Sequence, residues 1–235
     1  MEGSTMYTMM DAHPITLFII VAALLVTPLY IFAMYQQGGE SFAKGSIIAG
    51  GWLVFGATMF VVCMTRFSEQ LGIVGEFLVP FVWALPSAIL FFFKDWFLDK
   101  RLSQRALIGL QLWRAIGAVF LVEMFRGNLP GIFAWPAGVG DILVALVALL
   151  VLWIYRAVKE IPSKSVYIVI LVGMIDFFFA FFFGFTSSDS PLHLFSHDFP
   201  NQVTVFPTGM IPLYLVPYAI FFHTLSFLNE RKFGA

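Results

Sequence analysis

Long uninterrupted runs of apolar residues alternate with short polar segments along the whole chain. Seven of these runs reach the length of about 20 residues that a helix needs to cross the hydrocarbon core of a bilayer. They lie at residues 14–35, 46–64, 72–93, 106–124, 134–155, 165–185 and 207–228. Their apolar residues are consecutive rather than alternating, which excludes the strands of a membrane β-barrel. The pattern predicts an all-α polytopic membrane protein, a single domain over residues 1–235 with seven transmembrane helices.

Basic residues are distributed unevenly between these runs. If the N-terminus lies outside, ten Lys and Arg residues fall in cytoplasmic segments, and only Arg66 and Arg126 fall in outer ones. Cytoplasmic loops of membrane proteins are enriched in Lys and Arg. The sequence therefore predicts an outside N-terminus and a cytoplasmic C-terminus. No Lys or Arg precedes the first run, unlike in a cleaved signal peptide, so we expect this run to remain as a membrane helix.

Composition agrees with a membrane location and narrows the expected partners. Hydrophobic residues make up 60% of the 235 residues and charged residues 11%, whereas a soluble domain has about 25% charged residues. The single cysteine, Cys63, excludes a disulfide framework, and the net charge of −1 argues against nucleic acid as a partner. We therefore expect the lipid bilayer and a small-molecule or ion ligand as partners, without a cofactor.

Ionisable and polar residues inside the apolar runs are the candidates for a functional site. Such residues are costly in the bilayer interior and usually face other helices or a water-filled cavity. The candidates are Glu76, Gln111, Arg114, Glu123, Asp141, Asp176 and His223. Ordered by depth, they predict a polar track from the outer to the inner surface, as in proton-coupled carriers. The alternative interpretation is that each charge is a buried structural clamp.

Spacing along the helices predicts which of these charges meet. Arg114 and Glu123 are nine residues apart, which places them on opposite faces of a helix. We expect Glu123 to pair with Arg126, three residues further on, and Arg114 to need an acid or carbonyl from another helix. Asp141 and Asp176 each lie in a stripe of small residues, which lets helices approach closely. The fifth and sixth spans should therefore pack together.

The outer loop at residues 186–206 contains a second candidate site. His193 and His197 are four residues apart, a spacing that lets two imidazoles on one helical face reach the same metal ion. Asp198 or Asp189 would then be a further ligand. The same segment also fits an amphipathic turn at the membrane surface, so the metal site and the surface turn are alternatives.

The segment Gly138-Val139-Gly140-Asp141 resembles the Gly-x-Gly-Asp motif of intramembrane aspartyl proteases. The resemblance implies that Asp141 is one of two catalytic carboxylates and that Asp176 is the second. It covers four residues. In those protease families the partner aspartate precedes the motif, whereas Asp176 follows it.

A longer resemblance is to a group of bacterial multi-pass membrane proteins without an assigned function. It rests on Arg114-x-x-Gly117-x-x-Phe120-Leu121, on Leu129-Pro130-x-x-Phe133-Ala134-x-Pro136-Ala137-Gly138-x-Gly140-Asp141, and on His223. The resemblance implies a location in a bacterial inner membrane and gives no activity. It also implies that the arginine, the aspartate and the segment between them belong to one functional unit.

Glycine and proline are concentrated in residues 129–140, just before Asp141. Both residue types disfavour a regular helix. Irregular backbone at membrane depth is tolerated only where protein or water satisfies it. We therefore expect a re-entrant turn in this segment, leading to a cavity lined by Asp141.

Three functions fit these residues. The first is a small-solute or proton-coupled carrier or membrane sensor, with Asp141 and Asp176 as titrating groups, Arg114 as counter-ion and His223 as inner relay. The second is an intramembrane enzyme, either an aspartyl protease or a metal-assisted hydrolase that uses the outer-loop histidines. The third is a structural or assembly subunit in which every charge is paired. We favour the first, which makes the protein a transport or binding protein rather than an enzyme.

Overall fold

The computed structural model describes residues 13–65, 77–189 and 192–234, and the regular elements in these residues are all helical. They are α1 (Pro14–Gln37), α2 (Phe42–Met64), α5 (Leu78–Phe92), α6 (Lys94–Phe97), α7 (Gln104–Gly109), the 3-10 helix η2 (Leu112–Gly117), α8 (Ala118–Phe125), α9 (Gly131–Ile154), α10 (Ser163–Ser187), the π-helix η3 (Ile211–Leu215) and α11 (Val216–Phe233). The all-α prediction is confirmed for the described part of the chain.

Six helices in the described residues are long and apolar enough to cross a membrane. They are Pro14–Gln37, Phe42–Met64, Gln104–Phe125, Gly131–Ile154, Ser163–Ser187 and Ile211–Phe233. The expected run at residues 72–93 corresponds to α5, which has 15 residues and is shorter than the others. Residues 72–76 of that run lie outside the described part of the chain. The lengths and composition of the helices identify a multi-pass membrane protein.

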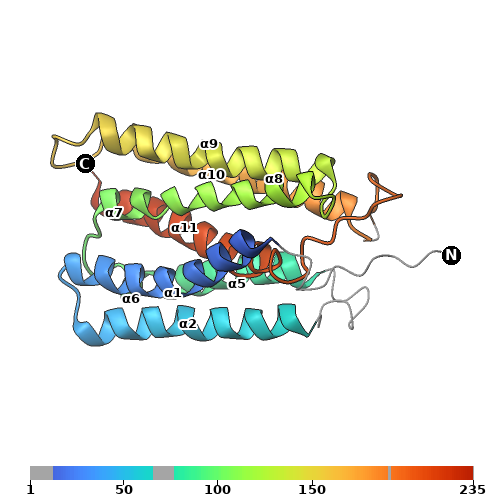
Figure 1. Ribbon diagram of the computed structural model, residues 1–235. Helices are drawn as coiled ribbons and strands as arrows, with labels where there is room; N and C mark the ends of the chain where they lie inside the picture. The colour runs from blue at the N-terminus through green and yellow to red at the C-terminus, as the bar shows by residue number, and fades with distance from the viewer. Residues whose placement is uncertain (1–12, 66–76, 190–191, 235) are drawn as a thin grey trace.

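The helices form one elongated bundle in which most of them run along a common direction (Figure 1). α7, α8, α9 and α10 lie on one side, α1 and α2 lie on the other, and α11 runs between the two groups. α11 packs against α5, α7 and α10, while α9 packs against α10 and η2. The side chains of Tyr218, Phe222 and Leu225 in α11 are buried almost completely. α11 is therefore the centre of the bundle, and the prediction that the fifth and sixth spans, α9 and α10, pack together is confirmed.

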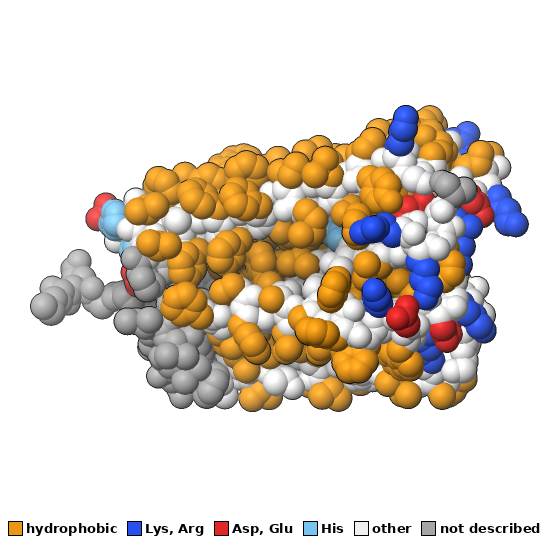
Figure 2. All heavy atoms as spheres, turned by 180° about the vertical axis from the view of Figure 1, so that it is seen from behind, with side chains coloured by type: hydrophobic (Ala, Val, Ile, Leu, Met, Phe, Trp, Pro, Cys, Tyr) orange, Lys and Arg blue, Asp and Glu red, His pale blue; other side chains and the backbone are white. Residues whose placement is uncertain are grey.

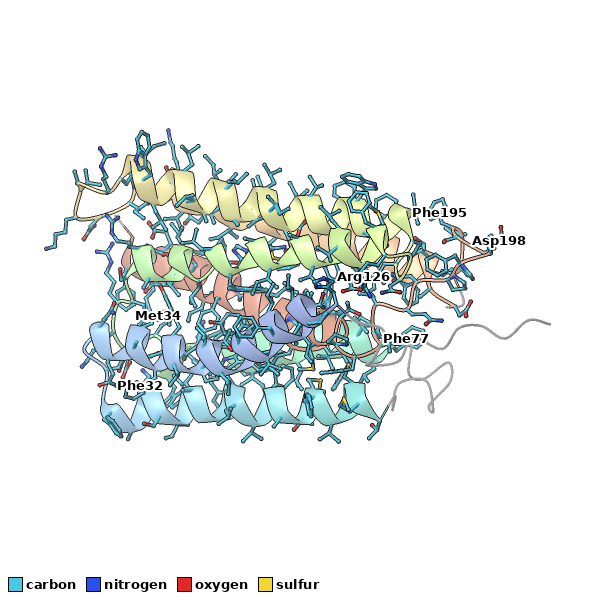
Figure 3. All side chains as sticks on the ribbon, in the orientation of Figure 1. Phe32, Met34, Phe77, Arg126, Phe195 and Asp198 are labelled. Atoms are coloured by element: carbon cyan, nitrogen blue, oxygen red, sulfur yellow. The ribbon has the colours of Figure 1, made fainter. Side chains whose placement is uncertain are left out.

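The two ends of the bundle differ in charge. Figure 2 shows Lys and Arg side chains gathered at one end, next to a wide apolar surface over the rest of the visible face. This basic end holds the turn between α1 and α2 and the end of α11 (Figure 1). Ion pairs there join Lys44 to Asp99, and Arg101 to Glu160 at 2.9 Å. Phe77, Phe195 and Asp198 lie at the opposite end, where α10 finishes (Figure 3).

The segment before Asp141 is helical, so the expected re-entrant turn is wrong. α9 begins at Gly131 and continues through Pro136 without a break. A Cβ atom on Gly138 would lie 3.1 Å from the carbonyl oxygen of Gly117, which is tighter than an ordinary contact. Glycine at this position allows close helix packing and does not form a turn. Contacts with the neighbouring helix offset the low helix propensity of glycine.

Candidate functional site

The fourth span is interrupted at the candidate site. α7 ends at Gly109, the 3-10 helix η2 covers Leu112–Gly117, and α8 then continues in the same direction. A 3-10 stretch inside a longer helix often marks a functional hinge or a strained sequence. Arg114 lies in η2, and its side chain is completely buried. The interruption and the buried charge therefore coincide.

Arg114 bridges aspartates from two other helices. Its Nε donates a hydrogen bond to Oδ1 of Asp141 on α9 at 2.7 Å, and its Nη2 donates to Oδ2 of Asp176 on α10. Its Nη1 donates to the carbonyl oxygen of Gly173 at 3.4 Å. The guanidinium carbon lies 3.9 Å from the centre of the Phe177 ring, within the range of a cation–π contact. One buried cation thus connects η2, α9 and α10.

We call Arg114, Asp141 and Asp176 the Arg–Asp cluster. Both aspartates are buried, with 6% and 7% of their surface exposed. Removing one partner from a buried ion pair leaves an uncompensated charge and is strongly destabilising. The guanidinium of Arg114 is therefore the counter-ion of both aspartates. The Gly-x-Gly-Asp resemblance does not imply such an arginine. A shared proton between two carboxyls, as in aspartic proteases, is a different arrangement.

Three glycines allow the polar groups to approach so closely. Each faces a polar side chain of the next long span in the chain, and the pairs are Gly117 with Asp141, Gly140 with Asp176 and Gly173 with His223. A Cβ atom on any of these glycines would overlap the facing side chain. The glycine–polar pairs therefore run in sequence through η2, α9, α10 and α11.

His223 and Gln111 adjoin the cluster. Each is 1% exposed, and the His223 ring centre lies 6.1 Å from that of Phe177. Among the described residues, Nε2 of His223 and Oε1 of Gln111 have no hydrogen-bond partner. A buried polar atom without a partner is costly and requires an explanation, of which a functional role is one. His223 lies against Gly173, whose carbonyl oxygen accepts a hydrogen bond from Arg114, while Gln111 contacts Arg114 through its backbone carbonyl.

A cavity of about 400 Å³ runs from the cluster towards the end of the bundle opposite the basic end. The Arg–Asp cluster forms part of its lining. Its walls are mainly aromatic and include Trp83, Phe120, Phe133, Phe177, Phe181 and Phe185. Ser188, Asp189 and residues 200–205, which follow α10, line its mouth. Aromatic walls with a few convergent polar groups are typical of small-molecule sites.

Glu123 belongs to a different set of contacts, at the end of α8. It accepts hydrogen bonds from Oγ1 of Thr16 at 2.5 Å and from Nδ2 of Asn128 at 2.7 Å. The expected ion pair with Arg126 is present, with an Nε–Oε2 distance of 3.7 Å. These contacts connect the start of α1 to the end of α8, and Glu123 does not line the cavity. The remaining candidate, Glu76, lies outside the described residues.

The outer-loop histidines lie close together, but their segment is not helical. The ring centres of His193 and His197 are 4.5 Å apart, and Nδ1 of His193 is 3.4 Å from Oδ1 of Asp189. Asp198 lies in the same loop, beyond the end of α10 (Figure 3). Within residues 13–65, 77–189 and 192–234, no three His, Cys, Asp or Glu side chains are grouped so as to hold a metal ion.

Sequence reasoning missed the aromatic wall of the cavity. Phe177, Phe181 and Phe185 are spaced four residues apart in α10, and all three line the cavity. Residues at this spacing share one face of a helix. The spacing was therefore a usable signal, although the many other phenylalanines of the same helix obscure it.

Comparison with known proteins gives a family but no activity. The family model described as "Domain of unknown function (DUF8737)" matches residues 74–229, more than half of the chain. The matched region contains the Arg–Asp cluster, the glycine–polar pairs and the cavity. No curated protein and no solved structure matches the chain.

Proposed function

This chain belongs to the DUF8737 family, and we propose that it is a proton-coupled membrane carrier for a small solute. The observation that carries the proposal is the cavity that ends on the buried Arg–Asp cluster. Ionisable side chains at membrane depth that face a cavity are typical of substrate and proton pathways. The carboxylates of Asp141 and Asp176 would bind and release the proton, and Arg114 would hold them in place.

Interrupted helices on two sides of the cavity support a carrier. η2 interrupts the fourth span at Arg114, and the π-helix η3 precedes α11 in the last span. Pro212 in η3 lines the cavity, and its carbonyl oxygen accepts a hydrogen bond from Nε1 of Trp83 at 2.7 Å. Membrane carriers commonly build their sites at discontinuous helices, where irregular backbone lines the cavity.

We also propose that α5 completes a seven-span topology in a bacterial inner membrane, with the N-terminus outside. α1 begins at the end of the bundle opposite the finish of α11, as an odd number of crossings requires (Figure 1). The basic end then faces the cytoplasm, in agreement with the usual enrichment of Lys and Arg there. In this orientation the cavity opens to the outside.

Cysteine accessibility tests whether the cavity opens outwards. Cys63 is the only cysteine and is buried, so Cys63→Ser provides a background without thiols. In this background Ala180→Cys, in the cavity lining, should react with a membrane-impermeant thiol reagent added from outside. Ile175→Cys, on the exposed apolar face of the same helix, should not react, because lipid covers it. If Ser188→Cys at the mouth reacts but Ala180→Cys does not, the proposed cavity is wrong.

A further inference from the structure

We infer that the solute is an organic monocation with an apolar body, and that it exchanges for a proton at the Arg–Asp cluster. The inference rests on the proposed function and adds the chemical class of the ligand. Its support comes from the charge at the inner end of the cavity and from the chemistry of the cavity walls.

The inner end of the cavity has an excess of negative charge. Asp141 and Asp176 supply two carboxylates against one guanidinium from Arg114, so the fully ionised cluster has a net charge of −1. In the part of the chain that the structure describes, the other titratable groups near the cavity are His223 on α11, which lies against Gly173, and Asp189 at the mouth. Among the described residues that line the cavity, Arg114 is the only basic one. An uncompensated charge is expensive at membrane depth, so the cluster requires one more positive charge.

The walls suit the body of an organic cation. Aromatic faces attract cations, and the effect increases when water is excluded. The guanidinium already uses the ring of Phe177 in this way. Further along the wall, Phe120 and Phe133 form an edge-to-face pair at 5.2 Å, and Trp83 and Phe181 form another at 5.5 Å. An anion would add to the negative charge of the ionised cluster, and a neutral solute could not replace a proton there.

The cation and the proton compete for the same charge. In the ligand-free protein one carboxyl group of the cluster holds a proton. When the cation enters, this proton leaves for the outer solution, so one proton is released for each cation bound and the charge of the site does not change. Because coupling between two ligands is reciprocal, the affinity for the cation rises with pH and falls as the cluster is protonated.

Tetraphenylphosphonium and tetraphenylborate test the sign of the charge, because they have nearly the same shape and opposite charges. In the Cys63→Ser background, tetraphenylphosphonium should protect Ala180→Cys from the thiol reagent, and tetraphenylborate at the same concentration should not. Asp141→Asn or Asp176→Asn should weaken the protection by more than about tenfold, because the cluster loses its excess negative charge. Asp198→Asn is the control, because this exposed carboxylate lies in the loop after α10 and does not line the cavity, and it should change the protection by less than about threefold.

The outcomes separate this inference from the proposed function. If Ala180→Cys reacts from outside but only tetraphenylborate protects it, or neither probe does, the cation inference is wrong and the outward cavity stands. If Ala180→Cys does not react without any probe, the proposed function itself fails. If an Asn variant does not fold, the exchange of cation for proton is tested on the protein with both aspartates intact, by measuring proton release when tetraphenylphosphonium binds. Binding of tetraphenylphosphonium without proton release in weak buffer, or with an affinity independent of pH, would overturn it.

Discussion

Arg114 donates hydrogen bonds to side chains on two helices other than its own, so at the scale of single residues it contributes to both the fold and the site. Its need for an acid from another helix could be predicted, because its position on the fourth span excludes Glu123. The sequence suggested Arg114 as a counter-ion to Asp141 and Asp176, but its direct contacts could not be derived, because the sequence does not say that its helix packs beside both of theirs. The stripes of small residues around Asp141 and Asp176 indicated close packing, but not that one guanidinium bonds to both.

Arg114→Gln should lower the free energy of unfolding by about 3–5 kcal/mol, because it removes the counter-ion and the hydrogen-bond donor of two buried aspartates. Thermal unfolding in detergent measures the effect. The matched control is Arg126→Gln, whose side chain is 42% exposed and pairs with Glu123, and which should cost less than about 1 kcal/mol. Equal losses in the two variants would show that the cluster does not hold the helices together.

Gly140→Ala and Gly51→Ala should have opposite effects on stability. The new Cβ atom at residue 140 would overlap the carboxylate of Asp176, which cannot move away while it is bonded to Arg114. Overpacking of this kind costs about 1–3 kcal/mol. Apart from its chain neighbours and the nearby backbone of its own helix, no described residue has an atom within 4 Å of a Cβ atom at Gly51 in α2, so alanine there should stabilise by about 0.4–1 kcal/mol. Denaturation of both variants in the same detergent checks the signs, and destabilisation by both would contradict the prediction.

At the scale of elements, hydropathy located the spans but not their interruptions. The average over a run is insensitive to a change from α to 3-10 or π hydrogen bonding, so η2 and η3 were not expected. For residues 129–140 the error was the reverse, because an irregular turn was expected and a helix is present. Packing of α9 against η2 and α8 outweighs the low helix propensity of these residues. In the sequence alone glycine indicates a turn, whereas in this bundle several glycines lie at contacts between two helices.

Glu123 shows how a structural charge differs from a functional one, because it ties the start of α1 to the end of α8. Glu123→Ala should lower the free energy of unfolding by about 2–3 kcal/mol, since it removes the acceptor of buried or partly buried donors. Protection of Ala180→Cys by tetraphenylphosphonium should be unchanged under conditions where the variant is folded. If protection is lost while stability is unchanged, Glu123 contributes to the binding site and the structural interpretation is wrong.

At the scale of the whole molecule, the two ends of the bundle differ in their content of basic residues, and the sequence was sufficient to predict this difference. Basic residues far apart in the sequence gather at one end, as the loop count indicated. α11 is less apolar than α9 or α10, but this did not predict its central position, because the span Gln104–Phe125 is similarly polar and less buried. A central helix needs no apolar surface towards lipid and can contain polar residues that the others exclude.

The proposed orientation predicts opposite accessibility of two loops in the Cys63→Ser background. Leu194→Cys, in the loop after α10, should react with an impermeant thiol reagent in intact cells, and Val158→Cys, between α9 and α10, only after the membrane is opened. Both native side chains are exposed, so burial does not explain a difference. The reverse pattern would place the basic end outside and turn the cavity towards the cytoplasm.

The glycine–polar pairs also restrict how the family can evolve. Because the missing side chain of Gly117, Gly140 or Gly173 is the space in which Asp141, Asp176 or His223 lies, neither member of a pair is free to change alone. In an alignment of relatives we expect the pairs to covary, with alanine or serine tolerated at a glycine position only where its partner has become smaller. Relatives that keep the bundle but have lost all three pairs together would then be the ones that no longer bind the cation.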